Sequence, residues 1–316
     1  MRYFVTGGAG FIGSNYVEHL LQNVKGVTGV TIYDKFTYAA NPRNYEKFTN
    51  DPRLTVIRGD ICDSELLENS ISNHDYVVHF AAESHVDRSI DDASAFVQTN
   101  VLGTFNVLEA SYKTGIETVI HVSTDEVYGS LAEGSADESY PLKPSSPYAA
   151  SKAASDLLAR SYFVTHGLDV RTTRCCNNYG KYQFPEKVIP VFIDKLNSGE
   201  KLPIYGDGKN LREWIHVSDH VRGIQVALEM GHPGEIYNIG TGLHLTNNEL
   251  ATEIISLMDF SDNMKSYITD RKGHDFRYAV DSRKIETLGF EILVNFSDGL
   301  RETINWYCEN SYWWSE

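Results

Sequence analysis

Residues 2–21 read Arg2-Tyr-Phe-Val-Thr6, then Gly7-Gly-Ala-Gly10-Phe-Ile-Gly13, then Ser14-Asn-Tyr-Val-Glu-His-Leu-Leu21. The first segment is a short apolar run and the last has helical apolar spacing, so the stretch predicts a strand, a glycine turn and a helix. Gly7 permits a tight turn, Gly10 lets the backbone approach a pyrophosphate, and Gly13 allows close packing of the helix on the strand. Unpaired N–H groups at the start of that helix would bind the phosphates.

The next strand-like segment, Val30-Thr-Ile-Tyr-Asp34, ends in an acid about twenty residues past the glycines. A carboxylate at this place accepts hydrogen bonds from both ribose hydroxyls of a dinucleotide and repels a 2′-phosphate. No arginine follows Asp34 directly. The segment therefore favours NAD over NADP as the cofactor.

Further strand-like segments alternate with helical ones along the first half of the chain. The strands are expected at 54–61, 75–82 and 118–123, with a helix over 99–112. This alternation predicts an α/β fold of Rossmann type, a doubly wound parallel sheet.

From Asp169 onward the chain becomes a series of short, turn-rich pieces, which predict a smaller, interleaved α/β domain for the substrate. Residues 235–240 return to strand-like composition, and Thr246-Asn-Asn-Glu249 has the capping-box pattern of a helix start. We expect an NAD-binding domain at 1–174 plus about 217–252, and a substrate-binding domain at 175–216 and 253–316.

The composition limits the partners of the chain. Its 316 residues carry a formal net charge of −15 and are 41% hydrophobic and 22% charged, as in an ordinary globular protein. The charge argues against nucleic acid or an anionic membrane as a partner. No apolar run approaches the roughly 18 residues of a membrane helix, and the strand at the amino end leaves no room for a signal peptide. A cytoplasmic protein is expected.

The cysteines and histidines predict no metal site. Two of the four cysteines stand alone, and the neighbours Cys175 and Cys176 are poorly placed to bridge each other, so reduced thiols are expected. His216 and His220 have the spacing of a zinc helix but lack the glutamate that follows the first histidine in that motif.

Tyr148 and Lys152 form the first candidate catalytic motif. They are four residues apart, so on a helix they share one face. A tyrosine becomes a useful base near neutral pH only if its pKa falls by about three units. We expect the Lys152 ammonium and a positively charged nicotinamide ring to lower it.

The second candidate motif is the stretch His121-Val-Ser-Thr-Asp-Glu126. It predicts a buried strand that ends at the edge where open α/β sheets bind ligands. Adjacent carboxylates can act as acid and base if their surroundings separate their pKa values. The alternative is a solvated turn whose two acids begin a helix.

These motifs together resemble the extended short-chain dehydrogenase/reductases and, more narrowly, the dTDP-glucose 4,6-dehydratase family. The resemblance rests on 6–14, on His79-Phe-Ala-Ala-Glu-Ser-His-Val-Asp-Arg-Ser89, on 123–129, and on Tyr148 with Lys152. It extends through 177–180, 186–190, 206–217 and 270–275, so it covers nearly the whole chain.

The resemblance implies a hydro-lyase that converts dTDP-glucose to dTDP-4-keto-6-deoxyglucose plus water in deoxysugar biosynthesis. The steps would be oxidation at carbon 4, elimination across carbons 5 and 6, and hydride return to carbon 6. NAD would be tightly bound and regenerated in each turnover. Tyr148 would take the proton of the carbon 4 hydroxyl, assisted by Thr124 and Lys152. Glu126 would remove the carbon 5 proton, and protonated Asp125 would donate to the departing hydroxyl.

The resemblance also assigns residues to three overlapping sites. The catalytic residues would be Thr124, Asp125, Glu126, Tyr148 and Lys152. The NAD site would comprise Gly7, Gly10, Phe11, Ile12, Gly13, Asp34, Lys35, Phe36, Thr37, Asp60, Ile61, Ala81, Ala82, Ser84, Thr99, Tyr148, Lys152 and Asn178. The dTDP-glucose site would comprise Ser84, Thr124, Asn177, Lys187, Val188, Pro203, Ile204, Tyr205, Arg212, Asn247, Arg271 and His274.

Three residues depart from the family pattern: Cys176, Lys181 and Lys272 replace a common serine and two common prolines. These changes touch the rim of the substrate site and would alter affinity or nucleotide choice. The family also implies a homodimer that pairs two helices per subunit, here 99–113 and about 148–165, whose Ala- and Ser-rich faces permit close packing.

Two other functions compete with the dehydratase. A nucleotide-sugar 4-epimerase or decarboxylase on the same scaffold would share Thr124, Tyr148 and Lys152 but would not need Asp125 beside Glu126. A non-catalytic NAD-binding or redox-sensing module would need neither Tyr148 nor Lys152.

Overall fold

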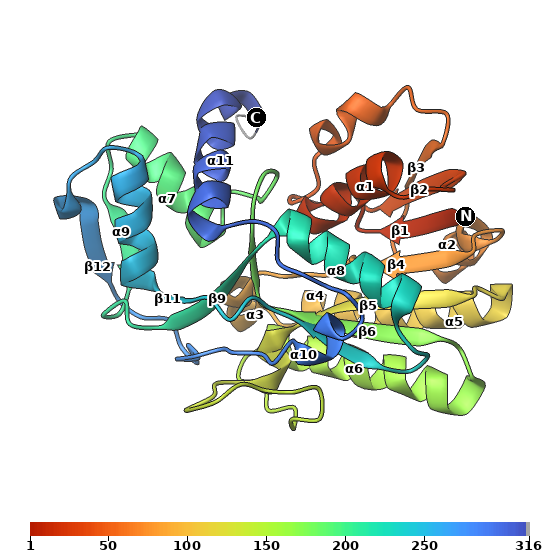
Figure 1. Cartoon of the computed structure of the whole chain (residues 1–316). Helices are drawn as coiled ribbons and strands as arrows, with labels where there is room; N and C mark the ends of the chain where they lie inside the picture. The colour runs from red at the N-terminus through yellow and green to blue at the C-terminus, as the bar shows by residue number, and fades with distance from the viewer. Residues whose placement is uncertain (314–316) are drawn as a thin grey trace.

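The computed structural model describes residues 1–313, and its main element is a seven-stranded parallel sheet in the order β10-β6-β5-β4-β1-β2-β3 (Figure 1). The strands are β1 (Arg2–Thr6), β2 (Gly29–Asp34), β3 (Leu54–Arg58), β4 (Tyr76–His79), β5 (Thr118–Thr124), β6 (Val170–Cys175) and β10 (Ile236–Ile239). The predicted Rossmann-type sheet is confirmed. β3 and β4 end earlier than predicted because the chain leaves the sheet there, so that Asp60 and Ala81 line a cleft.

Helices cover both faces of this sheet (Figure 1). One face packs against α1 (Phe11–Asn23) and α8 (Val217–Met230), and the other against α2 (Ser64–Ile71), α5 (Thr104–Thr114) and α6 (Pro147–His166). The central strands β1 and β4 are mostly buried and largely apolar, as expected of strands covered on both faces, whereas the edge strand β3 is partly exposed and β6 is mostly polar.

The helix predicted over 99–112 is longer and less regular than expected. It runs through α4 (Ser94–Phe96) and a π-helical segment, η3 (Val97–Gly103), into α5. Asn100 of η3 accepts a hydrogen bond from Glu83 N at 2.8 Å and donates to Glu83 O at 3.0 Å and to Ser151 Oγ at 2.9 Å. The irregular turn thereby fixes the loop after β4, where predicted site residues lie.

A second group of elements, at the left of Figure 1, has its own apolar core. It contains a three-stranded sheet in the order β11-β9-β7 and a two-stranded sheet of β12 and β8. The bounds are β7 (Asn177–Tyr179), β8 (Leu202–Tyr205), β9 (Leu211–His216), β11 (His244–Thr246), β12 (Lys265–Ile268), α7 (Val188–Asn197), α9 (Asn247–Leu257) and α11 (Phe296–Glu309). The capping box of Thr246 and Glu249 at the start of α9 is confirmed.

The domain division drawn from the sequence remains a prediction. β10 joins the main sheet, but β11 and α9, which that division assigned to the NAD-binding part, contact β9 and α7 instead. Residues 314–316 of the predicted range 253–316 lie outside the described residues.

The remaining short elements lie in the connections. They are η1 (Pro42–Asn44), η2 (Glu46–Phe48), α3 (Val86–Asp91), η4 (Asp125–Tyr128), η5 (Asp262–Met264), α10 (Arg283–Glu286) and η6 (Ser311–Trp313). Within residues 1–313, no helix combines the length and the apolar composition that crossing a membrane requires.

Candidate functional site

A cleft of about 370 Å³ lies at the carboxyl ends of the main strands and extends from the glycine turn to Tyr148 and Lys152. All five predicted catalytic residues line it, and so does every predicted cofactor residue except Phe36. Five predicted substrate residues also line it: Ser84, Thr124, Asn177, Lys187 and Val188. The predicted residues that line this cleft therefore come from more than six separate segments of the sequence.

A second, larger cleft of about 1010 Å³ lies between α1, α8 and α11. Its wall carries side chains of both charges, including Glu18, Lys181, Arg222 and Glu302. None of the predicted catalytic, cofactor or substrate residues lines it. The volume of a cleft alone therefore does not identify the active site, and the smaller cleft, which contains the predicted residues, is the candidate site.

The glycine turn has the backbone that a dinucleotide pyrophosphate requires. Gly7 has φ +69°, in the left-handed region, and a Cβ on Gly13 would lie 2.3 Å from Gly7 O. Gly10 is the N-cap of α1 and provides no side-chain cap. The first N–H groups of α1 are thus left for an anion, which the dipole of the helix also favours.

Asp34 lies where the ribose of a dinucleotide is bound. Its Oδ2 accepts a hydrogen bond from Ala9 N at 3.0 Å, and its Oδ1 accepts one from Phe36 N at 2.8 Å. Burial raises the pKa of Asp34, and these two backbone N–H groups lower it. Phe36 shapes this corner through its backbone, with φ +57°, while its side chain packs against the core. A glycine cradle, an uncapped helix start and a ribose carboxylate all fit NAD.

The turn after β5 is a single 3₁₀ turn, η4, rather than an α-helix. Thr124 caps it by accepting a hydrogen bond from Glu126 N at 3.2 Å, and it donates to Asp125 Oδ1 at 3.2 Å. Asp125 is only 3% exposed. The alternative of a solvated turn is therefore wrong, because one of the two carboxyl groups lies in the interior.

The two adjacent carboxyl groups have different surroundings. Burial raises the pKa of Asp125 well above its usual range, and the negative charges of Glu126 and Glu213 raise it further. Its Oδ2 is buried and has no hydrogen-bond partner among residues 1–313. Burial and neighbouring negative charge therefore favour the protonated form of Asp125.

Burial also raises the pKa of Glu126, but three cations oppose that effect: Arg212, Arg271 and Lys187. Tyr278 donates a hydrogen bond to Glu126 Oε2 at 3.4 Å. Positive charge close by favours the carboxylate form. The surroundings thus favour the protonated form more strongly for Asp125 than for Glu126, and acid–base chemistry by two carboxyl groups requires such a difference.

Tyr148 and Lys152 share one face of α6, as predicted, but do not interact as expected. Burial, followed by the charge of Glu126, raises the pKa of Tyr148, and only a hydrogen bond with Thr124 opposes this. Lys152 Nζ donates to Val122 O at 2.7 Å. The expectation that Lys152 lowers the tyrosine pKa is not met, because the ammonium is directed at a backbone carbonyl.

Lys152 lies above a buried charged network. Burial lowers its pKa to about 8, and the carboxylate of Asp156 raises it. Although burial disfavours the charge, hydrogen bonding to His121 and the charge of Arg174 hold the pKa of Asp156 at about 2. Asp156 lies 3.2 Å from His121 Nε2 and 2.8 Å from Arg174 Nε. A permanently ionised Asp156 therefore preserves the lysine ammonium at neutral pH.

Cations from the second group of elements face the cleft from the other side. Lys187 Nζ donates to Ser84 O at 2.8 Å, and burial lowers the pKa of Lys187. Arg212 lies over the ring of Tyr278, 4.4 Å from its centroid. Lys187, Arg212 and Arg271 all lower the pKa of Glu126, so the three cations act on the same carboxyl group.

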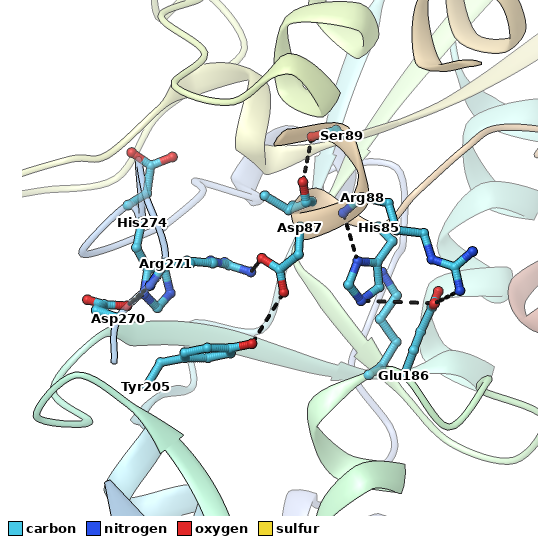
Figure 2. Close-up of polar contacts among 12 residues, drawn as sticks. His85, Asp87, Arg88, Ser89, Glu186, Tyr205, Asp270, Arg271 and His274 are labelled. Carbon is cyan, nitrogen blue, oxygen red and sulfur yellow. Dashed lines mark hydrogen bonds and ion pairs between the residues drawn. The ribbon is translucent and has the colours of Figure 1, made fainter. Parts of the chain in front are cut away.

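The short helix α3 connects the two walls of the site (Figure 2). Asp87 lies 3.4 Å from Arg271 Nη1 and accepts a hydrogen bond from Tyr205 OH at 3.4 Å. Arg88, also on α3, forms an ion pair with Glu186 at 3.1 Å. Arg271 and Tyr205, two predicted substrate residues outside the cleft lining, are thereby both held by Asp87 of α3.

The other predicted substrate residues outside the lining are placed less directly. His274 Nδ1 contacts Asp270 Oδ1 at 2.7 Å, next to Arg271 (Figure 2). Asn247 begins α9, and Pro203 lies on β8. Ile204 is buried in the core of the second group. The arginines and His274 thus lie near the cleft mouth, whereas Ile204 contributes its side chain to packing.

Several residues of the site carried no signal in the sequence. Tyr278 contacts Glu126 from far along the chain and lies in no motif. His220, which was weighed only for its zinc-like spacing, lines the cleft and lies 2.8 Å from Asn178 Oδ1. Cys175 and Trp214 also line the cleft. No local pattern could have identified these positions, because tertiary contacts place them there.

Comparison with known proteins gives a consistent family. A family model described as GDP-mannose 4,6 dehydratase matches residues 4–303. The dTDP-glucose 4,6-dehydratase of Streptomyces niveus is 51% identical over 318 residues, which cover 99% of this chain and 95% of that relative.

Solved structures show the same fold. DesIV, a dTDP-glucose 4,6-dehydratase from Streptomyces venezuelae solved with NAD bound, is 53% identical with a TM-score of 0.98, and the match covers 100% of this chain and 99% of that one. The UDP-glucose 4-epimerase of Thermotoga maritima, solved with UDP-glucose, is 30% identical with a TM-score of 0.90, over 98% of this chain and 100% of that one. The scaffold is thus similar to those of enzymes with two different reactions.

Proposed function

Because the chain belongs to the GDP-mannose 4,6-dehydratase family, we infer that it is an NAD-dependent dTDP-glucose 4,6-dehydratase, a hydro-lyase of deoxysugar biosynthesis. It converts dTDP-glucose to dTDP-4-keto-6-deoxyglucose and water. One observation supports this over an epimerase on the same scaffold. A buried Asp125, whose surroundings favour its protonated form, lies beside Glu126, and an epimerase needs no such acid–base pair.

NAD fits the residues at one end of the cleft. The glycine turn and the first turn of α1 would hold the pyrophosphate, and Asp34 would bind the adenosine ribose hydroxyls. When bound, NAD supplies the oxidation at carbon 4 and the reduction at carbon 6. Lys152 would help to hold the nicotinamide ribose beneath Tyr148.

Tyr148 would accept the proton of the carbon 4 hydroxyl. Its hydroxyl lies beside Thr124, which orients both the tyrosine and the sugar oxygen by hydrogen bonding. The Lys152 ammonium, fixed by Val122 O, adds positive charge under this site. Ionised Asp156 keeps that charge in place.

Glu126 and Asp125 would carry out the elimination. The new ketone at carbon 4 acidifies the hydrogen on carbon 5, and Glu126 takes this proton as a carboxylate. Asp125 donates its proton to the carbon 6 hydroxyl, which leaves as water. Each group enters the step in the protonation state that its surroundings favour.

The remaining predicted residues would bind the nucleotide. Arg271, Arg212 and Lys187 are concentrated at one place in a chain whose net charge is −15. Such a cluster favours a diphosphate over a neutral ligand. Ser84, Asn177, Asn247 and His274 would complete the site with neutral hydrogen bonds.

Product analysis tests the proposed function directly. The purified protein is incubated with dTDP-, UDP- and GDP-hexoses without added reductant. We expect a 4-keto-6-deoxy product from dTDP-glucose and no net accumulation of reduced NAD. Epimerised sugar, or unchanged dTDP-glucose in an NAD-loaded preparation, would exclude the dehydratase.

The lowered pKa of Lys152 predicts that activity falls at high pH. Because burial lowers its pKa to about 8, the ammonium is lost as the pH rises through that value, and kcat should fall there. Lys152→Arg keeps its charge at any such pH, so its smaller kcat should no longer decline in this range. The measurement is kcat from pH 6 to about 10, with NAD saturating. If kcat of the Arg variant fell with rising pH as that of the wild type does, the loss of activity at high pH would belong to another group.

Replacement of Arg271 is expected to weaken substrate binding without a large effect on kcat. Arg271→Ala should raise KM for dTDP-glucose about 10- to 100-fold, the value of a hydrogen bond to a charged group, with kcat changed little. Steady-state kinetics measure both constants. Arg283→Ala is the matched control, because Arg283 is exposed and pairs only with Asp281 in the described chain. An unchanged KM for the Arg271 variant would remove it from the diphosphate site.

We also propose a homodimer formed by η3, α5 and α6, in the cytoplasm. Leu157 and Val164 on α6 are 59% and 63% exposed, and Leu102 and Phe105 of the adjacent η3 and α5 are exposed too. The ring of Phe105 lies 6.4 Å from that of Tyr162, so the apolar surface is continuous across both helices. Apolar side chains gathered in this way mark an interaction surface.

The double substitution Leu157→Arg, Val164→Arg should convert this dimer to a monomer, because it places two charges in the apolar contact. Light scattering during size-exclusion chromatography measures the mass. Leu293→Arg, at a 67% exposed position on neither helix, should leave the mass unchanged. A monomeric wild type would contradict the proposal.

A further inference from the structure

The carboxyl end of the described chain lies against the loop that supports the glycine turn. Trp313, the last residue of η6, is 3% exposed. Its Nε1 donates to Asn44 Oδ1 at 2.8 Å, and its carbonyl accepts a hydrogen bond from Asn41 Nδ2 at 2.9 Å. Arg43 also donates to the carbonyl of Tyr312. Asn41, which caps η1, and Arg43 and Asn44 of η1 thus all form hydrogen bonds with η6.

The same loop holds Ala9, which lies inside the glycine turn. Asn44 Nδ2 donates to Ala9 O at 2.9 Å, and Asn41 N donates to the same oxygen at 3.0 Å. On the other side, Ala9 N donates to Asp34 Oδ2 at 3.0 Å. The Ala9 backbone between Gly7 and Gly10 is therefore fixed at both its N–H and its carbonyl.

Trp313 is anchored in turn by aromatic residues of the second group. Its ring lies 5.4 Å from that of Trp306 on α11 and 6.1 Å from that of Tyr182. Tyr182 directly precedes Gln183 and Phe184, which line the cleft. Trp313 therefore joins α11, a wall of the cleft and the glycine turn, although these parts are far apart in sequence.

We propose that Trp313 is a positioning residue for NAD, which acts through Asn44 and Ala9 to hold the glycine turn in its pyrophosphate-binding conformation. The proposal rests on the NAD site inferred above. A turn that binds phosphate through backbone N–H groups gains affinity when its conformation is fixed before binding, because less entropy is lost on binding. An enzyme that regenerates its cofactor in each turnover gains from such retention.

Two variants remove the connection at different points. Trp313→Phe keeps an aromatic ring in the cluster but deletes the donor to Asn44. Asn44→Ala deletes both the acceptor of that bond and the donor to Ala9 O. For each we expect purification with less bound NAD and a Kd for NAD raised about 3- to 30-fold. The double variant should lose less than the product of the two single effects, because both act on one path.

Trp306→Phe is the control, since it makes the same chemical change in the same aromatic cluster. No hydrogen bond from Trp306 to the loop 41–44 is found in residues 1–313. It should retain NAD as the wild type does. NAD content and Kd are measured on purified protein by calorimetry without any sugar nucleotide, so the result does not depend on the proposed reaction. At saturating NAD, kcat of both test variants should lie within about twofold of wild type.

A wild-type Kd for NAD in Trp313→Phe would overturn the proposal. The proposal would also be overturned if Trp313→Phe bound NAD more weakly while Asn44→Ala bound it as the wild type does, because the coupling would then not pass through the loop. A Trp306→Phe variant that loses as much NAD as Trp313→Phe would assign the effect to general packing of the aromatic cluster. Equal melting temperatures of the apo proteins exclude a change in global stability as the cause.

Discussion

Replacement of Asp125 by Asn is expected to lower kcat by about 10²- to 10⁴-fold, the usual contribution of a general acid. The side chain is nearly isosteric, so the fold and KM should change little. The reason lies in the protonation state. Burial, and then the charges of Glu126 and Glu213, raise the pKa of Asp125 and favour its protonated form, and Asn has no such proton to donate to the departing hydroxyl.

Glu126→Gln should cause a comparable loss, but at an earlier step. The two variants are separated by incubating each with dTDP-glucose in deuterated water. Asp125→Asn retains the base, so deuterium should enter carbon 5 of the sugar faster than product forms. Glu126→Gln should show neither exchange nor product. The opposite pattern would reverse the two roles. A double variant that still epimerised a nucleotide sugar at the wild-type rate would point to an epimerase.

Tyr148→Phe is expected to lower kcat by at least about 10³-fold, because it removes the proton acceptor of the first step. The ring would remain, packed edge-on against Phe96 at 6.3 Å, so binding of NAD and of substrate should be preserved. Rapid-mixing measurements with saturating substrate should detect no oxidation at carbon 4.

Thr124→Val is the matched comparison for this variant. It removes the hydrogen bond that opposes the raised pKa of Tyr148, the cap of η4 and the hydrogen bond to Asp125 Oδ1, and leaves the phenol in place. A smaller loss, about tenfold, is expected, with the pH dependence of kcat moved to higher pH. If Tyr148→Phe retained more activity than Thr124→Val, the tyrosine could not be the base.

Local patterns predicted the parts of this molecule that local geometry determines. Glycines at 7, 10 and 13 gave the turn, and the spacing of Tyr148 and Lys152 placed both on one helix face. Thr246 and Glu249 gave a capping box that is present. Each of these depends on residues within one turn, so no distant contact is needed to interpret it.

The contacts that set protonation states could not be predicted in this way. Burial is the main cause of the raised pKa of Asp125, and the charges of Glu126 and of Glu213, which lies on β9, raise it further. Tyr278, which lies in no motif, contacts Glu126 directly, and the pairing of Asp87 with Arg271 joins two segments far apart in sequence. The effect of Lys152 on Tyr148 was wrongly predicted because sequence spacing gives a shared face but not the direction of a side chain. The carbonyl of Val122 determines that direction.

The turn η4 presents Glu126 on a backbone that other groups close. Its shape depends on the hydroxyl of Thr124, on backbone N–H of Glu126, and on Gly129, whose N–H donates to Glu126 O at 3.1 Å. The carboxylate of Glu126 takes no part in closing the turn. The side chain at position 126 can therefore be replaced without loss of the hydrogen bonds that close the turn, whereas Asp125 also accepts a hydrogen bond from Thr124. The backbone that presents Glu126 is thus independent of the chemistry of that side chain.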